Sequence, residues 1–190
     1  MNDTELLDLM TELKALHDGH FLLSSGRHSD RYFQCARLLQ FPELARELGA
    51  AIARRLESVT CDLVVSPALG GILIGHEVAR AAGRRFVFTE RQDGVMTLRR
   101  GFAIEPKEKV LVVEDVVTRG TSVREVMDVV EREGGVVTGL GAIVDRTGPD
   151  VELPLPLQAL TRVEVATYEP DQCPLCAAGK PLVKPGSRGN

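Results

Sequence analysis

The sequence lacks the long apolar segments of a membrane protein. Its longest strongly apolar stretches, residues 110–113 and 136–144, fall far short of the roughly 20 residues that span a bilayer. The N-terminal residues are acidic and have neither the basic start nor the apolar stretch of a signal peptide. We therefore expect a cytoplasmic protein with no membrane partner.

Basic tracts and a disulfide framework are also missing. The formal net charge is −4 and no lysine or arginine run stands out, which disfavours nucleic acid as the main partner. Of the four cysteines only Cys173 and Cys176 are close in sequence, so free thiols are expected in a reducing compartment. The 44% hydrophobic content still supplies an ordinary core, which predicts a single domain over residues 1–190.

Common site motifs are absent too. The sequence contains no G-x-x-x-x-G-K-[ST] loop, and Gly139 and Gly141 are not followed by a third glycine at the dinucleotide-binding spacing. His76 and Glu77 begin like a zinc-protease motif, but Arg80 stands where the second histidine would be required. These absences remove the common nucleotide-binding loops and the zinc-protease reading.

The pair Cys173 and Cys176 has the spacing of half a zinc site. Structural zinc normally takes four protein ligands, and only two lie in this segment. The histidines, at positions 17, 20, 28 and 76, show no shared metal spacing. We therefore favour a small turn or a docked tail for the cysteine pair, with metal binding as the alternative.

Apolar residues recur with the spacing of helices and buried strands. Helical spacing predicts one helix over about 4–16, capped by Asp3 or Thr4, and a second that starts at Pro42. Residues 20–34 predict short strands around a turn at 24–26. Further along, buried strands and helices alternate, with strands near 63–65, 85–88, 110–113 and 136–144. This order predicts an α/β fold whose central parallel sheet is flanked by helices on both faces.

Ligands of such sheets bind beyond the carboxyl ends of the strands. That rule selects the loops 66–71, 89–101 and 114–122, together with Asp145 and Arg146 at the end of the last strong strand. In the loop 66–71, glycines would let the backbone approach an anion closely. A helix-starting turn with packing glycines is an equally good reading of that loop.

The segment 110–122 is the most informative. Glu114 and Asp115 follow a buried strand, and residues 118–122 form a Thr-Arg-Gly-Thr-Ser loop that opens a helix. Backbone amides, hydroxyl groups and the positive helix end suit a phosphate. Carboxylates do not bind phosphate, but paired acceptors suit the two hydroxyl donors of a ribose diol. The segment therefore predicts a site for a ribose 5′-phosphate, in preference to acids that merely end a strand and cap a helix.

The same segment resembles the motif that binds 5-phosphoribosyl-1-pyrophosphate (PRPP) in type I phosphoribosyltransferases, with Glu in place of the commoner Asp at the first acid. The resemblance implies the type I phosphoribosyltransferase fold, with a small N-terminal hood at about 1–40, a core at about 41–168 and a C-terminal tail at 169–190. It also implies a PRPP site formed by Ala68, Gly70, Gly71, Glu114, Asp115, Val116, Val117, Thr118, Arg119, Gly120, Thr121 and Ser122.

Residues 19–33 resemble the hood segment of orotate phosphoribosyltransferases, which has a Ser-Gly-x-x-Ser turn before an aromatic pair. The resemblance implies that Tyr32 and Phe33 stack near the base and that Thr118 contacts it. Arg146 would pair with the carboxylate of orotate, since a guanidinium binds a carboxylate in bidentate fashion. The implied reaction joins PRPP and orotate to give orotidine 5′-monophosphate and pyrophosphate, a step of pyrimidine biosynthesis.

The resemblance implies Mg²⁺ as the cofactor, bound mainly by PRPP oxygens and water near Asp115. Glu114 and Asp115 would hold the ribose and favour the cation that develops on it, while Arg91 and Arg100 would neutralise the departing pyrophosphate. In the family this loop, 90–101 here, reaches across a homodimer interface and completes the neighbouring site. Ser24 and Gly70 stand where many orotate enzymes have lysine, so those two lysine roles are not carried over.

Two other functions stay open. One is a phosphoribosyltransferase for a purine or for uracil, against which Arg146 argues because a neutral base has no use for a carboxylate clamp. The other is a nucleotide-sensing regulator that keeps the PRPP fold and binds RNA or DNA, which the net charge of −4 disfavours.

Overall fold

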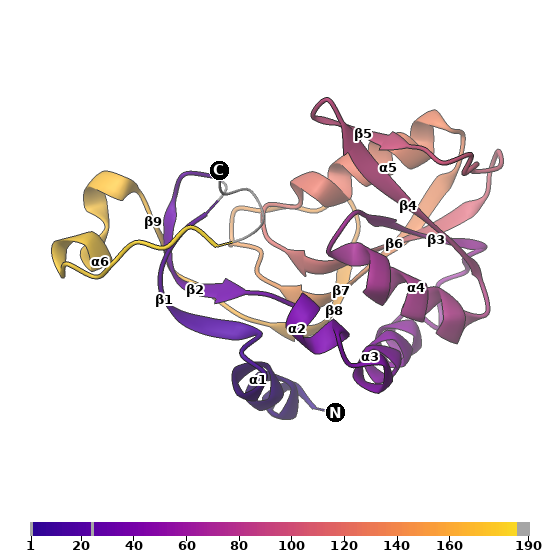
Figure 1. Cartoon of the computed structure of the whole chain (residues 1–190). Coiled ribbons are helices and arrows are strands. Elements are labelled where there is room, and N and C mark those ends of the chain that lie inside the picture. The colour runs from indigo at the N-terminus through magenta and orange to yellow at the C-terminus, as the bar shows by residue number, and fades with distance from the viewer. Residues whose placement is uncertain (1, 24, 186–190) are drawn as a thin grey trace. The chain divides into compact units, whose positions relative to one another are not determined.

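The computed structural model describes residues 2–23 and 25–185 (Figure 1). These residues form two compact units. The hood unit contains the described residues up to Arg37 together with those from Glu164 on, and the core unit is Leu38–Val163. The C-terminal tail thus belongs to the hood unit. Ser24, part of the predicted turn at 24–26, lies outside the described residues, as do the tail residues from 186 on.

The core unit is built on one sheet with the strand order β5-β4-β3-β6-β7-β8. The strands are β3 (Leu63–Pro67), β4 (Arg85–Gln92), β5 (Val95–Leu98), β6 (Lys109–Val117), β7 (Val136–Asp145) and β8 (Leu157–Arg162). All neighbours pair in parallel except β4 and β5, which are antiparallel. Every residue of β3 is buried, as expected for a central strand of a parallel sheet covered on both faces.

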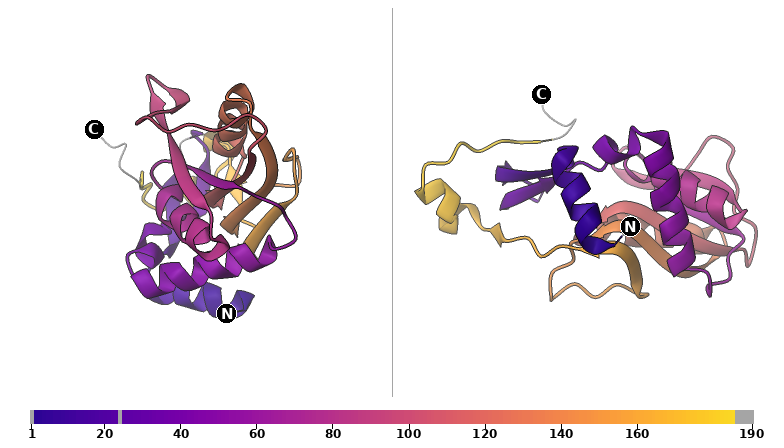
Figure 2. Two further views of the ribbon diagram at one scale, coloured as in Figure 1. Left: turned by 90° about the vertical axis from the view of Figure 1, so that its right-hand side faces the viewer. Right: turned by 90° about the horizontal axis from the view of Figure 1, so that it is seen from below.

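Helices cover both faces of this sheet (Figure 1 and Figure 2). The helices are α3 (Pro42–Arg55) and α4 (Gly71–Ala82) on one face and α5 (Thr121–Arg132) on the other. Val126 of α5 belongs to the same apolar core as Val112 of β6. On the opposite face, a Cβ on Gly141 would lie 2.8 Å from the side chain of Ile52 in α3. The predicted α/β architecture is therefore confirmed.

The hood unit contains a small antiparallel sheet in the order β1-β2-β9. Its elements are α1 (Asp3–Glu12), β1 (Leu16–Leu22), β2 (His28–Phe33), β9 (Thr167–Tyr168), η1 (Pro170–Gln172) and α6 (Pro174–Ala177), and α2 (Ala36–Leu39) spans the boundary to the core unit. The predicted strands within 20–34 are confirmed. The tail docks along β1 as well, since Val183 and Phe21 form a parallel bridge.

The predicted cap of the first helix was wrong. Asn2, rather than Asp3 or Thr4, caps α1: its side chain accepts a hydrogen bond from the Glu5 amide at 2.9 Å. The Glu5 carboxylate in turn accepts from the Asn2 amide at 2.8 Å. This reciprocal pair requires an acid three residues after the cap, and only Asn2 has Glu5 at that spacing.

Two strands are longer than predicted. β6 continues through Val117, because Glu114 still pairs with Ala142 of β7, so the acid pair lies in the strand rather than in a loop. β4 continues to Gln92 and forms a hairpin with β5 in most of the predicted loop 89–101. The turn residues Asp93 and Gly94 have φ values of 52° and 85°, the left-handed pair that a two-residue hairpin favours. Among the described residues, no helix has the length and apolar character needed to cross a membrane.

Candidate active site

The acid pair lies beside the loop that leaves β3. Glu114 is 8% exposed and Asp115 is partly buried. A Cβ on Gly70 would lie 2.8 Å from an Asp115 carboxylate oxygen, and a Cβ on Gly71 would lie 3.1 Å from Glu114 Oε1. Glycine at these two positions therefore lets the loop backbone approach the acids. Two of the loops selected from the sequence, 66–71 and 114–122, are thus brought together.

The third selected segment is tied to this loop through its backbone. The amide of Ala68 donates a hydrogen bond to the carbonyl oxygen of Thr89 in β4 at 2.7 Å, and the peptide between Ala68 and Leu69 is cis. The predicted anion-binding residues Ala68, Gly70 and Gly71 therefore lie between β4 and the acids at the end of β6. This is the carboxyl edge of the sheet, where ligands of parallel sheets bind.

Both acids have perturbed protonation. Burial raises the pKa of Glu114 well above its ordinary value, and the neighbouring charge of Asp115 raises it further. Burial also raises the pKa of Asp115, although the Val116 amide donates to Asp115 Oδ1 at 2.9 Å and favours the charged form. The pair therefore keeps a proton more readily than two isolated acids. Hydroxyl donors from a bound diol would compensate for the water that burial removes.

The loop after β6 has the geometry of a phosphate site. Thr118 and Arg119 are exposed, and Gly120, with a φ of 71°, is the last residue before α5. A Cβ at Gly120 would lie 2.4 Å from the Leu153 side chain. Gly120 has no side chain to cap the helix, so the first-turn amides of Thr121 and its neighbours face the loop together with the positive end of the helix dipole. A phosphate is the ligand that this arrangement suits.

Arg124 contacts the backbone of this loop and was not singled out from the sequence. Its Nη1 donates to the Arg119 carbonyl oxygen at 2.8 Å, and its Nη2 donates to the carbonyl oxygen of Glu152. Arg124 therefore fixes the backbone of the phosphate loop from the first turn of α5. A basic residue in the first turn of a helix opposes the helix dipole, and that unfavourable position was the available signal.

Arg146 lies at the end of β7, next to the phosphate loop. Its amide donates to the Val117 carbonyl oxygen at 2.8 Å, which places it beside the residue that precedes Thr118. The turn after Arg146 is held by Asp145, whose carboxylate accepts from the amide and the hydroxyl of Thr147 at 2.8 and 2.7 Å. The two core residues predicted to contact the base, Thr118 and Arg146, therefore follow adjacent strands.

The two predicted loop arginines lie on the β4–β5 hairpin and its C-terminal flank, and both are paired with acids. The guanidinium of Arg91 binds the Glu125 carboxylate of α5 through both terminal nitrogens. Arg100 binds Glu90 with two hydrogen bonds of 3.0 Å, and its guanidinium lies 5.4 Å from the centre of the Phe88 ring. A role in neutralising pyrophosphate would require both arginines to exchange these carboxylates for the ligand.

The predicted aromatic pair, Tyr32 and Phe33, lies on β2 of the hood unit. Neighbouring residues of a strand point to opposite faces, so the two rings do not form one stacking surface. Phe33 is 6% exposed, whereas Tyr32 is half-buried and its ring packs against Phe21 with 5.8 Å between centroids. Tyr32 is therefore the more accessible ring of the two.

An acid pair beside a glycine-containing loop at the carboxyl edge of a parallel sheet is typical of type I phosphoribosyltransferases. Comparisons with known proteins give the same class. Residues 34–152 match the family model described as the phosphoribosyl transferase domain. A solved adenine phosphoribosyltransferase from Thermoanaerobacter pseudethanolicus has the same fold, with a TM-score of 0.60 at 16% identity over 70% of this chain and 88% of that chain. At that identity the likeness concerns the fold alone.

More similar relatives narrow the family. The orotate phosphoribosyltransferase of Desulforamulus reducens is 52% identical, covering 99% of this chain and 98% of the relative, and that of Pelotomaculum thermopropionicum is 51% identical, covering 99% of each. The solved orotate phosphoribosyltransferase from Aeropyrum pernix matches with a TM-score of 0.67 at 25% identity, over 83% of this chain and 93% of that chain. The chain belongs to the orotate phosphoribosyltransferase family.

Proposed function

We propose that the protein transfers the phosphoribosyl group of PRPP to orotate, forming orotidine 5′-monophosphate and pyrophosphate in pyrimidine biosynthesis. Relatives with that name match over nearly the whole chain at about half identity. The observation that carries the choice of base is the position of Arg146, whose amide is bound to the end of β6 beside Thr118. A guanidinium carried by a residue at that position suits the carboxylate that distinguishes orotate from neutral bases.

The proposed mechanism depends on charge and orientation. Glu114 and Asp115 accept hydrogen bonds from the ribose hydroxyls, and their charge favours the positive ribose ring as the C1–O bond to pyrophosphate breaks. The bond from C1 to the orotate nitrogen forms as that C1–O bond is lost, and the proton of that nitrogen passes to the released pyrophosphate, which the loop amides at Gly70 and Gly71 stabilise. The 5′-phosphate stays on the loop before α5. Because the orotate nitrogen attacks C1 directly, the protein needs no nucleophile of its own.

We propose Mg²⁺ as the cofactor. The acid pair offers the oxygen donors that this ion prefers, and Asp115 lies against the backbone of Gly70 in the proposed pyrophosphate loop. A cation near the pair would also favour ionisation of both acids, whose pKa values burial raises. Bound through PRPP, the ion would neutralise the pyrophosphate charge.

We further propose a cytoplasmic homodimer in which the segment 90–101 completes the neighbouring site. The segment carries Arg91, Arg99 and Arg100, and Val95 on its hairpin is 62% exposed. Mixing two inactive variants, Asp115→Asn and Arg100→Ala, would test this sharing. If an arginine acts across the interface, the mixed dimer contains one site with both residues intact and recovers part of the activity; if each chain completes its own site, mixing restores nothing.

The reaction itself is tested with purified protein, PRPP, Mg²⁺ and orotate, by following the loss of orotate absorbance. Adenine, hypoxanthine and uracil run in parallel. PRPP- and Mg²⁺-dependent loss of orotate is expected. If only another base is turned over, the assignment of the PRPP site stands and the proposed role of Arg146 is wrong. PRPP binding without turnover of any base would favour the regulator, which a gel shift at controlled salt would then detect.

A further inference from the structure

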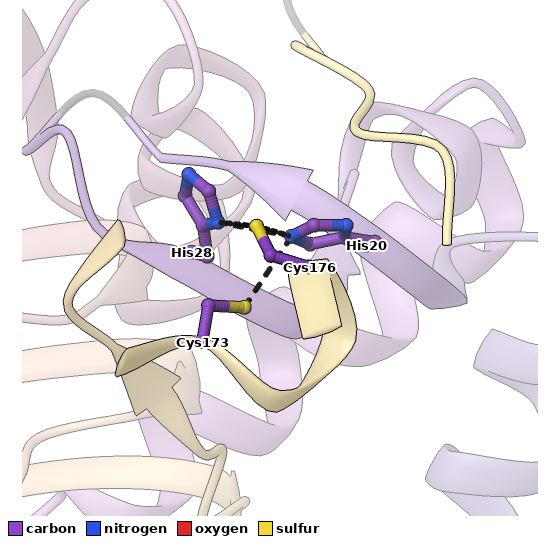
Figure 3. A group of neighbouring side chains, drawn as sticks. All are labelled: His20, His28, Cys173 and Cys176. Carbon is purple, nitrogen blue, oxygen red and sulfur yellow. Dashed lines mark hydrogen bonds between the residues drawn. The ribbon is translucent and has the colours of Figure 1, made fainter. Parts of the chain in front are cut away.

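Four potential metal ligands, none of which has a role in the proposed reaction, meet in the hood unit (Figure 3). His20 lies on β1, His28 on β2, Cys173 just before α6 and Cys176 within α6. One ligand atom from each lies within 4.8 Å of the others. His20, His28 and Cys173 are buried, whereas Cys176 is exposed and leaves a path from solvent. We propose that these four residues form a structural zinc site.

The distances between the four atoms suit one tetrahedral ion. Zinc bound at about 2.3 Å to sulfur and about 2.05 Å to nitrogen separates its ligands by roughly 3.3 Å for two nitrogens and roughly 3.5 Å for nitrogen and sulfur. His20 Nε2 and His28 Nδ1 are 2.9 Å apart. Cys173 Sγ and Cys176 Sγ lie 3.5 and 3.7 Å from His20 Nε2, and Cys176 Sγ lies 3.3 Å from His28 Nδ1. Small shifts would complete a tetrahedron.

The hydrogen bonding of His20 directs a lone pair into this cluster. Its Nδ1 lies 2.9 Å from the carbonyl oxygen of Lys180, which only accepts, so Nδ1 donates. In a neutral imidazole the other nitrogen, Nε2, then carries the lone pair. Nε2 is the atom that faces His28 and both thiols. A backbone carbonyl that fixes the remote nitrogen is the usual outer contact of a histidine that binds a metal.

The ligand set selects the kind of metal. Two thiolates with two imidazoles in a tetrahedral arrangement favour zinc over magnesium or calcium, which take oxygen ligands. With all four positions filled by protein, the site has the closed coordination of a structural site rather than the open position of a catalytic one. The proposal is independent of the acid pair and of the proposed reaction.

The site would fasten the tail to the hood sheet. The two histidines come from β1 and β2, and the two cysteines come from a segment more than 140 residues later in the chain. The apolar core of the described hood residues is small, with Leu6, Met10, Phe21 and Phe33 as its large buried side chains. Small units with little core commonly depend on a metal or disulfide for stability.

The sequence favoured a small turn or a docked tail for the cysteine pair and left metal binding as the alternative. The tail does dock, as expected, but it docks where the hood adds the two missing ligands. The register of β1 against β2 is irregular between Asp18 and Phe21, the stretch that contains His20. His20 and His28 come together through this irregular strand pairing, and the spacing of histidines along the sequence does not reveal such a contact.

The first test is the zinc content of the full-length protein after extensive dialysis, measured by mass spectrometry of the elements. About one zinc per chain is expected for a four-ligand site. Cys176→Ser and His28→Asn should each retain less than about a tenth of that content, because a three-ligand site holds zinc weakly. Two controls should keep full zinc: His17→Asn, on the same strand as His20, and Cys61→Ala, a buried thiol of the core unit.

Two further measurements exclude misfolding of the variants as the explanation. Zinc is removed from the parent protein with a chelator, and Co²⁺ is then added; visible absorption bands of tetrahedral cobalt thiolate are expected. Trypsin should cleave after Arg27, which directly precedes the ligand His28, faster in the stripped protein, and readdition of zinc should restore protection. Zinc content equal in the parent and both cluster variants would overturn the proposal. So would a parent that binds neither metal, or a Cys173–Cys176 disulfide with no metal.

Discussion

The acid pair of the core unit and the four-residue cluster of the hood unit are opposite kinds of polar site. Glu114 and Asp115 are neighbouring acids whose pKa values burial raises, and a ligand that supplies hydrogen-bond donors or positive charge would favour their ionised form. The hood cluster offers two imidazole nitrogens and two thiol sulfurs within 4.8 Å of one another. The acid pair suits catalysis, since its charges act on the cation that develops transiently on the ribose. The hood cluster suits a metal ion that stays bound.

The largest effect is expected from Asp115→Asn. The change keeps the shape of the side chain and removes its charge, so kcat/KM for orotate should fall by about 100- to 1000-fold. Asp128→Asn, an exposed acid on α5, is the matched control and should retain activity. Zinc content should be equal in both proteins if the two sites are independent. Near-parental turnover by Asp115→Asn would remove the acid pair from the mechanism.

Arg146→Ala is expected to have the next largest effect. Loss of a charge-assisted pair with the substrate carboxylate, about 2–3 kcal/mol, corresponds to a decrease in kcat/KM for orotate of roughly 30- to 150-fold. The affinity for PRPP, measured by calorimetry, should stay within about twofold of the parent, because the phosphate loop is intact. Arg132→Ala, an exposed arginine in the last turn of α5, is the control. Equal losses of PRPP and orotate affinity would instead assign Arg146 a structural role.

Gly120→Ala should weaken PRPP binding. Its φ of 71° costs an alanine about 1–2 kcal/mol, and the added Cβ would lie 2.4 Å from Leu153, so about a tenfold or greater loss of affinity is expected. Gly148→Ala provides a close control, since a Cβ there meets nothing within 4 Å. PRPP affinity would be measured by calorimetry for both variants. Parental affinity in Gly120→Ala would contradict the assignment of this loop to the phosphate.

The smallest expected effect concerns stability rather than turnover. Because burial raises the folded pKa of Glu114 above its unfolded value of about 4.3, the folded state binds more protons between the two values, and stability falls as pH rises through the folded pKa. Glu114→Gln removes this penalty, so its melting temperature should exceed that of the parent by a margin that grows with pH. Glu131→Gln, exposed on α5, should show no such trend. A margin independent of pH would contradict a raised pKa.

The two sites also differ in how far the sequence predicted them. The acid pair and phosphate loop come from one continuous segment, 110–122, whose strand, acids and glycine are all visible in order. The sequence did not show that β6 continues through Val117, because the polar residues at 114 and 115 interrupt the apolar run although their backbone still pairs with β7. β8 was also missed, since Leu157–Arg162 has a weak apolar pattern and depends on pairing with β7.

Contacts between distant segments were beyond reach of the sequence. The hood cluster joins residues 153 and 156 positions apart, and only the docked tail brings them together. The pairing of Arg91 with Glu125 has the same origin, because the β4–β5 hairpin must first fold against α5. By contrast, the turn at Asp93 and Gly94 carried a local signal, an Asp-Gly pair followed by the short stretch Val95–Leu98, that would have predicted the hairpin.

One measurement tests the central claim most directly. The purified protein is incubated with PRPP, Mg²⁺ and equal amounts of orotate, uracil, adenine and hypoxanthine in one reaction, and the nucleotide products are identified by mass spectrometry. The account predicts orotidine 5′-monophosphate as the dominant product, with one pyrophosphate released for each nucleotide formed. Uridine or purine monophosphates in its place, or no nucleotide at all, would contradict it.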